Sequence, residues 1–121
     1  MGKTVELGAA GERVAVEWLR AAGFVIMDTN WRAGRYELDI VANSGDIVHF
    51  VEVKLRKAGS LTAPEDAMTP AKCRALLKAA NFYIEQHGIT SDCRIDMIAV
   101  EYDDEGETVV RYIPDAVTPG R

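Results

Sequence analysis

The sequence predicts a single α/β domain in which a mixed β-sheet is flanked by helices. Its 121 residues fit one compact domain, and 48% hydrophobic with 27% charged residues is typical of a globular protein. Helix-like and strand-like patterns also follow one another in the order α-β-β-β-α-β-β. We expect one domain over residues 1–121, with a core over about residues 4–113 and a loose tail over 114–121.

The first part of the chain predicts one helix and one short strand. Small and apolar residues recur at helical spacing over residues 4–22, and Gly23 is a typical stop signal. A short strand is expected over residues 24–27 because Phe, Val, Ile and Met follow one another there. Residues 30–34 are expected to connect this strand to the next.

A β-hairpin is expected next. Residues 36–42 alternate between two kinds of side chain, and residues 47–55 form a second strand-like run. The Asn-Ser-Gly-Asp cluster at 43–46 is a turn signal.

The hairpin register decides which side chains share a face. A two-residue turn at 44–45 would put Glu37 directly opposite Glu52. Glu37, Asp39, Glu52 and Lys54 would then project from one side, since side chains opposite one another share a face. The other side is expected to be a core face formed by Leu38, Ile40, Ile47, Val51 and Val53, with a buried His49 among them.

The second part of the chain predicts a helix and two strands. Thr69 is a good N-cap for a helix over residues 70–86, because proline follows it, and Gly88 is a good stop. Strands are expected over residues 94–100 and 108–113, separated by an acidic turn.

The charged face of the hairpin is the strongest functional signal. Carboxylates that lie close together on a sheet repel one another, so Asp39 and Glu52 indicate a compensating cation. Mg²⁺ prefers oxygen ligands and keeps waters, and it would lower the pKa of a bound water and stabilise a phosphoryl centre. The ammonium of Lys54, two residues after Glu52, could orient water or offset developing negative charge. A solvated strand surface is the alternative explanation.

Glu12 is a further candidate. It falls within the small and apolar stripe of the first helix, where an unpaired carboxylate is costly. It could reach the sheet as an outer or water-mediated ligand, or it could lie at the edge of the stripe in water. These two interpretations stay open.

Composition restricts the class of protein. The formal net charge of −5 argues against a protein that coats DNA, although local nucleic-acid binding remains compatible with it. The sequence has no run of about 18 apolar residues, so no membrane span is expected, and the N-terminus has no signal-peptide pattern. We therefore expect a cytoplasmic protein that has no membrane partner and keeps its two cysteines reduced.

Several motifs occur in a fixed order over roughly residues 8–100. They are Gly11-Glu12, Asn30-Trp31-Arg32, Glu37-Leu38-Asp39-Ile40, Phe50-Val51-Glu52-Val53-Lys54 and Arg94-Ile95-Asp96. Together they resemble the YraN family of small, uncharacterised bacterial proteins, in the PD-(D/E)XK nuclease superfamily. The family is also similar to the archaeal Holliday junction resolvases.

This resemblance implies a restriction-endonuclease-like core that binds Mg²⁺ or Mn²⁺. It implies that Asp39 and Glu52 are metal ligands, with the carbonyl of Val53 as a third. Lys54 would be the catalytic lysine and Glu12 the helix carboxylate. By analogy with the resolvases, it also implies a homodimer that acts on branched DNA.

Cations near the expected site are candidate phosphate contacts, which position nucleic acid without reading its sequence. For Arg74 and Lys78, a solvated helix face is at least as good an explanation. The candidates are Arg32, Arg56, Lys57 and Lys72, of which Arg32 could equally pair with the carboxylates of the site.

Three functions follow from these observations. The first is a Mg²⁺-dependent endonuclease acting on branched or structured DNA, which the combination of Asp39, Glu52 and Lys54 favours. The second is a catalytically silent domain that binds nucleic acid or a protein partner. It is favoured by the acidic charge and by Tyr36, where the family commonly has glycine. A metalloenzyme acting on another phosphate ester is the third.

Overall fold

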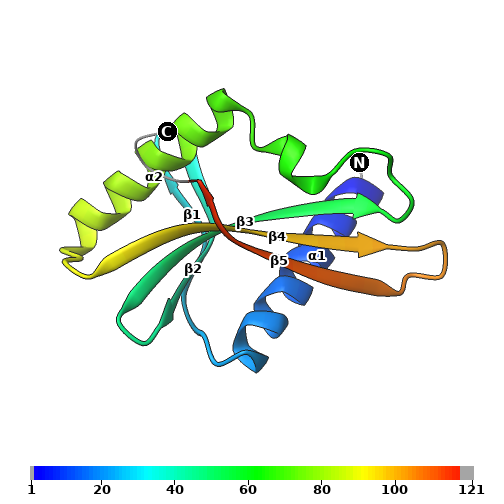
Figure 1. Cartoon of the computed structure of the whole chain (residues 1–121), viewed down its shortest axis with the longest axis horizontal. Helices are drawn as coiled ribbons and strands as arrows, with labels where there is room; N and C mark the ends of the chain where they lie inside the picture. The colour runs from blue at the N-terminus through cyan, green and yellow to red at the C-terminus, as the bar shows by residue number, and fades with distance from the viewer. Residues whose placement is uncertain (1, 118–121) are drawn as a thin grey trace.

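The elements of the chain occur in the expected order. They are α1 (Gly2–Ala21), β1 (Val25–Ala33), β2 (Tyr36–Ser44), β3 (Ile47–Lys57), the short 3₁₀ helix η1 (Pro64–Ala67), α2 (Pro70–His87), β4 (Asp92–Tyr102) and β5 (Thr108–Val117). The computed structural model describes the backbone of residues 2–117 and the side chains of residues 8–117. The strands form one five-stranded sheet in the order β1-β2-β3-β4-β5 (Figure 1). The pair β3–β4 is parallel and the other pairs are antiparallel, so the predicted mixed sheet is confirmed.

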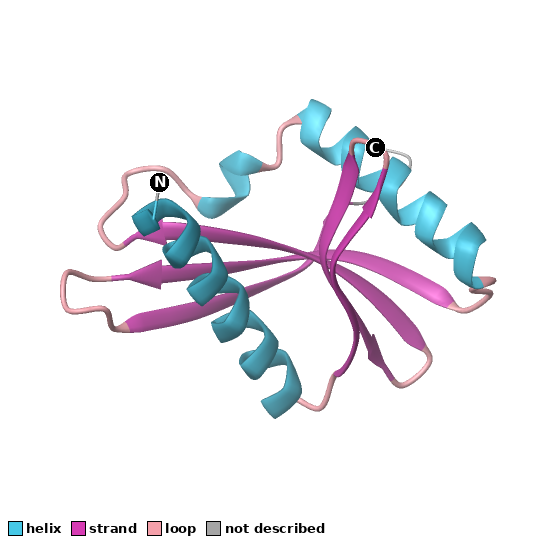
Figure 2. Cartoon of the chain, turned by 180° about the vertical axis from the view of Figure 1, so that it is seen from behind, coloured by secondary structure: helices cyan, strands magenta, loops and turns pink. Residues whose placement is uncertain are grey.

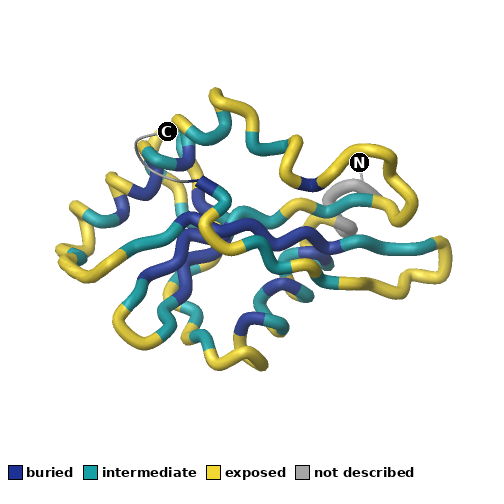
Figure 3. The backbone as a smooth tube through the Cα atoms, viewed as in Figure 1, coloured by how far each residue is buried: buried dark blue, intermediate teal, exposed yellow. Residues whose placement is uncertain are grey.

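The hydrophobic core has two parts, one on each face of the sheet. Phe50 and Tyr83 belong to the cluster beneath α2, whereas Leu19 and Val51 belong to the cluster beneath α1. Phe50 and Val51 are neighbours in β3, so strand alternation sends them to opposite faces. Figure 2 shows α1 lying across the sheet, and Figure 3 shows that the buried residues run along the central strands.

The first strand is longer than expected. β1 continues to Ala33 because Trp31 pairs with Leu38 and Arg32 pairs with Glu37 on β2. The prediction that residues 30–34 only connect two strands is therefore wrong. The turn is formed by Gly34 and its neighbour, and Gly34 has a φ of 59°, which glycine adopts without steric cost.

The turn of the β2–β3 hairpin lies one residue later than expected. Ser44 pairs with Ile47, which leaves residues 45–46 as the turn, and Gly45 has a φ of 60°. A glycine at the first central position of a two-residue turn matches the twist of the flanking strands. The pairing is consequently shifted by two positions, so the expected opposition of Glu37 and Glu52 is wrong. The ladder ends at the pair of Ile40 with Val51, so Asp39 and Glu52 are the first residues beyond it on their two strands.

The alternation of side chains along β2 is interrupted at Asp39, so residues on either side of it point to unexpected faces of the sheet. Tyr36 and Leu38 pack with the cluster beneath α2, but Ile40 packs with the cluster beneath α1. The expected single apolar face through Leu38 and Ile40 is therefore wrong. Backbone pairing of β2 with β3 covers Ile40–Ser44, and the irregularity begins where that pairing ends.

The second half of the chain confirms the predicted capping signals. The side chain of Thr69 accepts a hydrogen bond from the backbone of Lys72 at 3.2 Å. Gly88 ends α2 in the left-handed conformation, with φ 61° and ψ 38°. Among the described helices, none has the length and hydropathy needed to cross a membrane.

The last strand extends beyond residue 113, where the core was expected to end. β5 continues to Val117, so the prediction of a loose tail is wrong for residues 114–117, while residues 118–121 lie outside the described residues. The extension follows a break in the ladder between Ile113 and Val117, where the backbone N–H of Asp115 donates to Asp96 at 2.9 Å. This buried carboxylate thus holds the end of the strand.

Candidate functional site

The centre of the site is the point where β2 leaves its ladder with β3. The backbone N–H of Val53 donates to Oδ2 of Asp39 at 2.9 Å, so a side-chain carboxylate bridges the two strands there. Glu52 directly precedes Val53, so its carboxylate lies near that of Asp39 and feels its charge. The two carboxylates predicted as metal ligands are therefore brought together.

Glu52 is largely buried, with 14% of its side chain exposed. Burial raises the pKa of Glu52 to about 7, and the charge of Asp39 adds to that rise. Lys72 acts in the opposite direction, because its Nζ lies 2.8 Å from Oε2 of Glu52. Burial alone would lower the pKa of Lys72, but the hydrogen bond and charge of Glu52 outweigh it, so the pKa is raised. The site thus contains a costly carboxylate pair with one ammonium as its partner.

Glu12 reaches the same region from α1. Its side chain is half-buried, and burial raises its pKa. The charges of Asp39 and Glu37 raise that pKa further, while a hydrogen bond with Asn30 lowers it. Asn30 has a φ of 53°, a backbone conformation that asparagine tolerates better than most residues. Glu12 therefore contributes to the negative field of the site, and both interpretations of its role stay predictions.

Lys54 lies on β3 two residues beyond Glu52, so strand alternation puts both on one face. It is exposed, and it forms no ion pair with any residue that the structure describes. It lines a hollow between β3 and η1, together with Arg56 and Pro64. Its ammonium is thus available to a ligand that approaches from this side.

Each of the four predicted phosphate contacts interacts within the protein. Arg32 pairs with Glu37 at 3.3 Å, and Lys57 pairs with Asp104 at 3.0 Å, all four side chains being well exposed. Surface pairs of this kind are weak and open to exchange. The guanidinium of Arg56 instead donates to the carbonyl of Thr62 and holds the loop after β3. Lys72, as described above, is the partner of Glu52. Sequence reasoning placed Lys72 near the site but missed this pairing, for which the sequence has no signal.

The donor set can be compared with the preferences of a divalent cation. Among the side chains of residues 8–117, no group of three or more His, Cys, Asp or Glu is arranged to hold a metal ion. Two carboxylates, with one backbone carbonyl, supply only oxygen donors, which Mg²⁺ and Mn²⁺ prefer. Mg²⁺ commonly uses one or two carboxylates and keeps several waters. The adjacent carboxylates of Asp39 and Glu52 therefore fit such an ion.

A second polar network lies beneath α1 and serves the fold. Asp96 is fully buried and accepts hydrogen bonds from Nδ1 of His49 at 2.6 Å and from the hydroxyl of Tyr112 at 2.6 Å. The backbone of Asp115 supplies a third donor. The expected buried, satisfied His49 is confirmed. Arg94 does not pair with Asp96 but with Asp115, at 3.3 Å.

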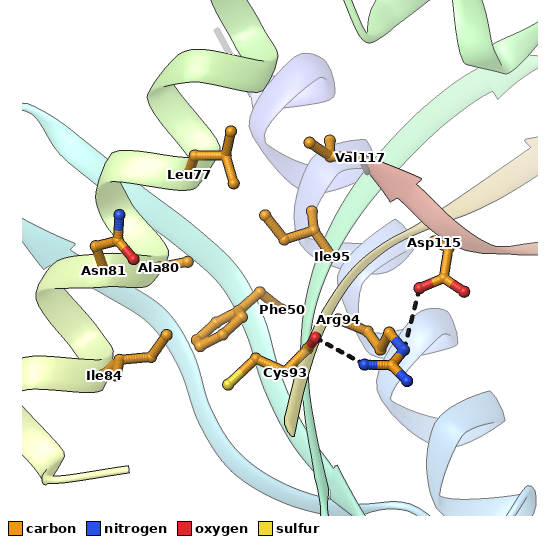
Figure 4. Close-up of a pocket in the computed structure, with 10 residues that line it drawn as sticks. All are labelled: Phe50, Leu77, Ala80, Asn81, Ile84, Cys93, Arg94, Ile95, Asp115 and Val117. Carbon is orange, nitrogen blue, oxygen red and sulfur yellow. Dashed lines mark hydrogen bonds and ion pairs between the residues drawn. The ribbon is translucent and has the colours of Figure 1, made fainter. Parts of the chain in front are cut away.

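A further pocket is separate from the carboxylates. It is a cavity of about 440 Å³ between α2, β4 and the end of β5, and Figure 4 shows its lining side chains. Most of the lining is apolar, and the pair of Arg94 and Asp115 lies at its edge. Because Asp39, Glu52 and Lys54 do not line it, this cavity is no part of the candidate site.

The fold and the site define a class of small mixed α/β proteins with a carboxylate pair between two strands of the sheet. The model of Uncharacterised protein family UPF0102 matches residues 11–100, and the chain belongs to this family. A UPF0102 protein of Flavobacterium psychrophilum is 36% identical over 116 residues, which cover 96% of this chain and 97% of that protein. One of Bacteroides fragilis is 40% identical over 113 residues, or 93% of each chain. One of Chlorobium chlorochromatii is 40% identical over 97 residues, or 80% of this chain and 75% of that protein.

Proposed function

We propose that this protein is an endonuclease that depends on Mg²⁺ or Mn²⁺ and hydrolyses phosphodiester bonds in branched or structured DNA. The observation that carries this proposal is the nearness of Asp39, which the N–H of Val53 holds in place, to the carboxylate of Glu52. A half-buried carboxylate pair contributes little to the stability of a fold, but it can bind a divalent cation.

Each residue of the site has a role in this proposal. Asp39 and Glu52 hold the ion, and the carbonyl of Val53 is the third protein ligand. When bound, the ion supplies Lewis-acid stabilisation and a water of lowered pKa. Lys54 offsets negative charge that develops on the phosphate, since its ammonium is exposed beside this face. Glu12 orients water from the side of α1.

Lys72 supports a second candidate function. Its ammonium already stands where Glu52 needs a cation, so the carboxylate is compensated within the protein. A catalytically silent domain that binds nucleic acid or a protein partner needs no metal ion beside this ion pair. The two functions therefore differ in whether a metal ion reaches Asp39 and Glu52 beside Lys72.

Cleavage of labelled DNA tests the proposal. The substrates are four-way junctions, flaps, single strands and blunt duplexes, with Mg²⁺, with Mn²⁺ or with EDTA. We expect cleavage by the wild type with metal and a loss of about 100-fold or more in Asp39→Asn and Lys54→Ala. Calorimetric titration with Mn²⁺ should show binding to the wild type that Asp39→Asn lacks. No cleavage of any substrate, together with no Mn²⁺ binding, would support the silent domain instead.

The proposal includes a homodimer. One domain carries one carboxylate pair, and cutting both strands of a branch requires two sites. Light scattering after size-exclusion chromatography, with and without a four-way junction, measures the number of chains directly. A single chain on the junction would limit the activity to one strand at a time.

A further inference from the structure

A hollow of about 320 Å³ between β2 and α2 combines positive charge with an aromatic ring. Arg35 and Tyr36 line one side of it, and Arg74 and Lys78 line the other. The α2 side is one stripe of the helix, since Ala71, Arg74, Ala75 and Lys78 recur at helical spacing. The lining includes no carboxylate, although the chain has 19 acidic and only 14 basic residues.

The three cations of this hollow have no ion-pair partner within the described part of the chain. Arg35, Arg74 and Lys78 are all exposed, whereas Arg32, Lys57 and Lys72 each pair with a carboxylate. Concentrated positive charge on an acidic protein is an electrostatic site for an anion. These three cations, like Lys54, are therefore free to meet phosphates.

The aromatic ring of Tyr36 is held in a defined place. Its hydroxyl accepts a hydrogen bond from Arg35 at 3.1 Å, and the guanidinium carbon of Arg35 lies 5.2 Å from the ring centroid. On α2, the ring of Phe82 lies 5.8 Å from that of Tyr36, and Phe82 is 45% exposed. The hydrogen bond from Arg35 lowers the pKa of Tyr36, and the charge of Lys78 adds to the effect. These partly exposed rings amid cations can stack a base.

On both β2 and α2, the residues that line the hollow lie close in sequence to residues of the candidate site. Along β2, Tyr36 precedes Asp39 by three residues, or about 10 Å of strand. Along α2, Ala71 in the hollow is followed by Lys72, whose ammonium contacts Glu52. A strand that leaves the carboxylates along α2 would therefore pass over the hollow.

We propose that this hollow, formed by Arg35, Tyr36, Arg74 and Lys78, binds an unpaired nucleic-acid strand next to the bond that the protein cuts. Arg74 and Lys78 contact consecutive stretches of the phosphate backbone, and Tyr36 stacks with a base. A base in a blunt duplex is already stacked between its neighbours, so Tyr36 distinguishes an unpaired arm from paired DNA. The proposal rests on the nuclease function proposed above and specifies its substrate as DNA with an unpaired segment.

Binding measured without cleavage tests this proposal. Fluorescence anisotropy in EDTA uses a labelled single strand, a blunt duplex and a duplex with an unpaired arm, over a series of salt concentrations. In Arg74→Ala/Lys78→Ala, we expect single-strand affinity to fall by about tenfold or more at low salt. The slope of log affinity against log salt should become shallower by about 1.4, which is about 0.7 for each phosphate that the variant no longer neutralises. The matched control is Arg13→Ala/Arg20→Ala, which removes two exposed cations of α1 that lie outside the hollow and form no ion pair with a described residue, and it should leave the slope unchanged.

The aromatic part of the proposal has its own pair of variants. Tyr36→Ala should weaken binding of the single strand and of the unpaired arm by about tenfold and leave the blunt duplex nearly unchanged. Tyr36→Phe keeps the ring and should bind within about twofold of the wild type, even though it loses the hydroxyl. Thermal unfolding of every variant confirms that the fold is retained.

The outcomes separate this proposal from the nuclease function. If the wild type binds no DNA, or if the two double variants lose affinity equally, the hollow is not a strand-binding site. Normal cleavage of armed substrates by Tyr36→Ala and Arg74→Ala/Lys78→Ala would likewise overturn it while leaving the nuclease function standing. Weaker binding by the hollow variants, with no cleavage by the wild type, would instead support the hollow and remove the nuclease.

Discussion

Nζ of Lys72 lies 2.8 Å from Oε2 of Glu52, so the helix between β3 and β4 provides the positive charge for a carboxylate on the sheet. This contact decides how the site behaves without metal. Glu52 is repelled by Asp39 and largely buried, and Lys72 is the only ammonium or guanidinium that contacts it within the described residues. The ion pair therefore competes with any metal ion for the same carboxylate.

Removing this ammonium tests the competition. Lys72→Met should lower the free energy of unfolding by about 1 kcal/mol at pH 8 in EDTA, since Glu52 loses its partner while Lys72 itself is 40% exposed. Added Mg²⁺ should then raise the melting temperature of the variant more than that of the wild type. Lys72→Arg keeps the charge and is the matched control. Equal responses to Mg²⁺ in all three proteins would show that Lys72 and metal do not share Glu52.

Tyr112 should be important for stability because Asp96 depends on it. Tyr112→Phe removes one of three donors from a fully buried carboxylate and should cost about 1.5–3 kcal/mol. Tyr102→Phe is the control, since no described residue forms a hydrogen bond with that hydroxyl, and it should change stability little. Urea denaturation measures both. A Tyr112→Phe variant as stable as the control would mean that water replaces the missing donor.

The close packing of α1 on β3 predicts a difference between two glycines. A Cβ at Gly11 would lie 3.1 Å from Cδ1 of Leu55, whereas a Cβ at Gly8 would meet nothing within 4 Å. Gly11→Leu should therefore cost about 1–3 kcal/mol through overpacking. Gly8→Ala should instead gain about 0.5–1 kcal/mol from helix propensity. Thermal unfolding distinguishes them, and a neutral Gly11→Leu would show that α1 can shift away from the sheet.

Tyr83 predicts a loss of stability at high pH. Burial and its hydrogen bond to Asp28, at 2.9 Å, raise the pKa of Tyr83 to about 12 from 10. The unfolded chain releases this proton near pH 10 and the folded chain keeps it. Its contribution to stability is thus complete below pH 10 and is lost as the pH rises toward 12. Tyr83→Phe should be less stable at pH 8 and decline less steeply above pH 10. Denaturation curves with parallel pH dependence in both proteins would contradict this.

Much of the fold follows from local signals in the sequence. Thr69 and Gly88 predict both ends of α2, because capping depends on a few neighbouring atoms. The predicted turn of the β2–β3 hairpin differs from the observed turn by one residue. Alternation alone does not distinguish them, since either pair of turn residues leaves the same side chains on the same faces. The change of facing at Asp39 has no local signal, because it arises from a contact with Val53, 14 residues away.

In the site, too, local features can be predicted from the sequence and long-range contacts cannot. The sequence predicts Asp39 and Glu52 as neighbours because strand alternation puts them on one face, and the structure brings them together although the register differs from the predicted one. The partner of Glu52 lies on α2, and a helix position relative to a sheet depends on the whole core. For the same reason Arg74 and Lys78, which sequence alone describes as a solvated helix face, line the hollow with Tyr36.

The parallel pairing of β3 with β4 also has a consequence for the order of assembly. Its first pair joins Ile47 to Asp92, 45 positions later in the chain, and long-range pairing of this kind closes slowly. Asp39 and Glu52 lie within one hairpin, which can form in microseconds. We therefore expect the folding chain to bring Asp39 and Glu52 together early, before the crossover helix docks and Lys72 reaches Glu52. Until the helix docks, cations from the solution would offset the negative charge of Glu52, which Lys72 offsets in the folded protein.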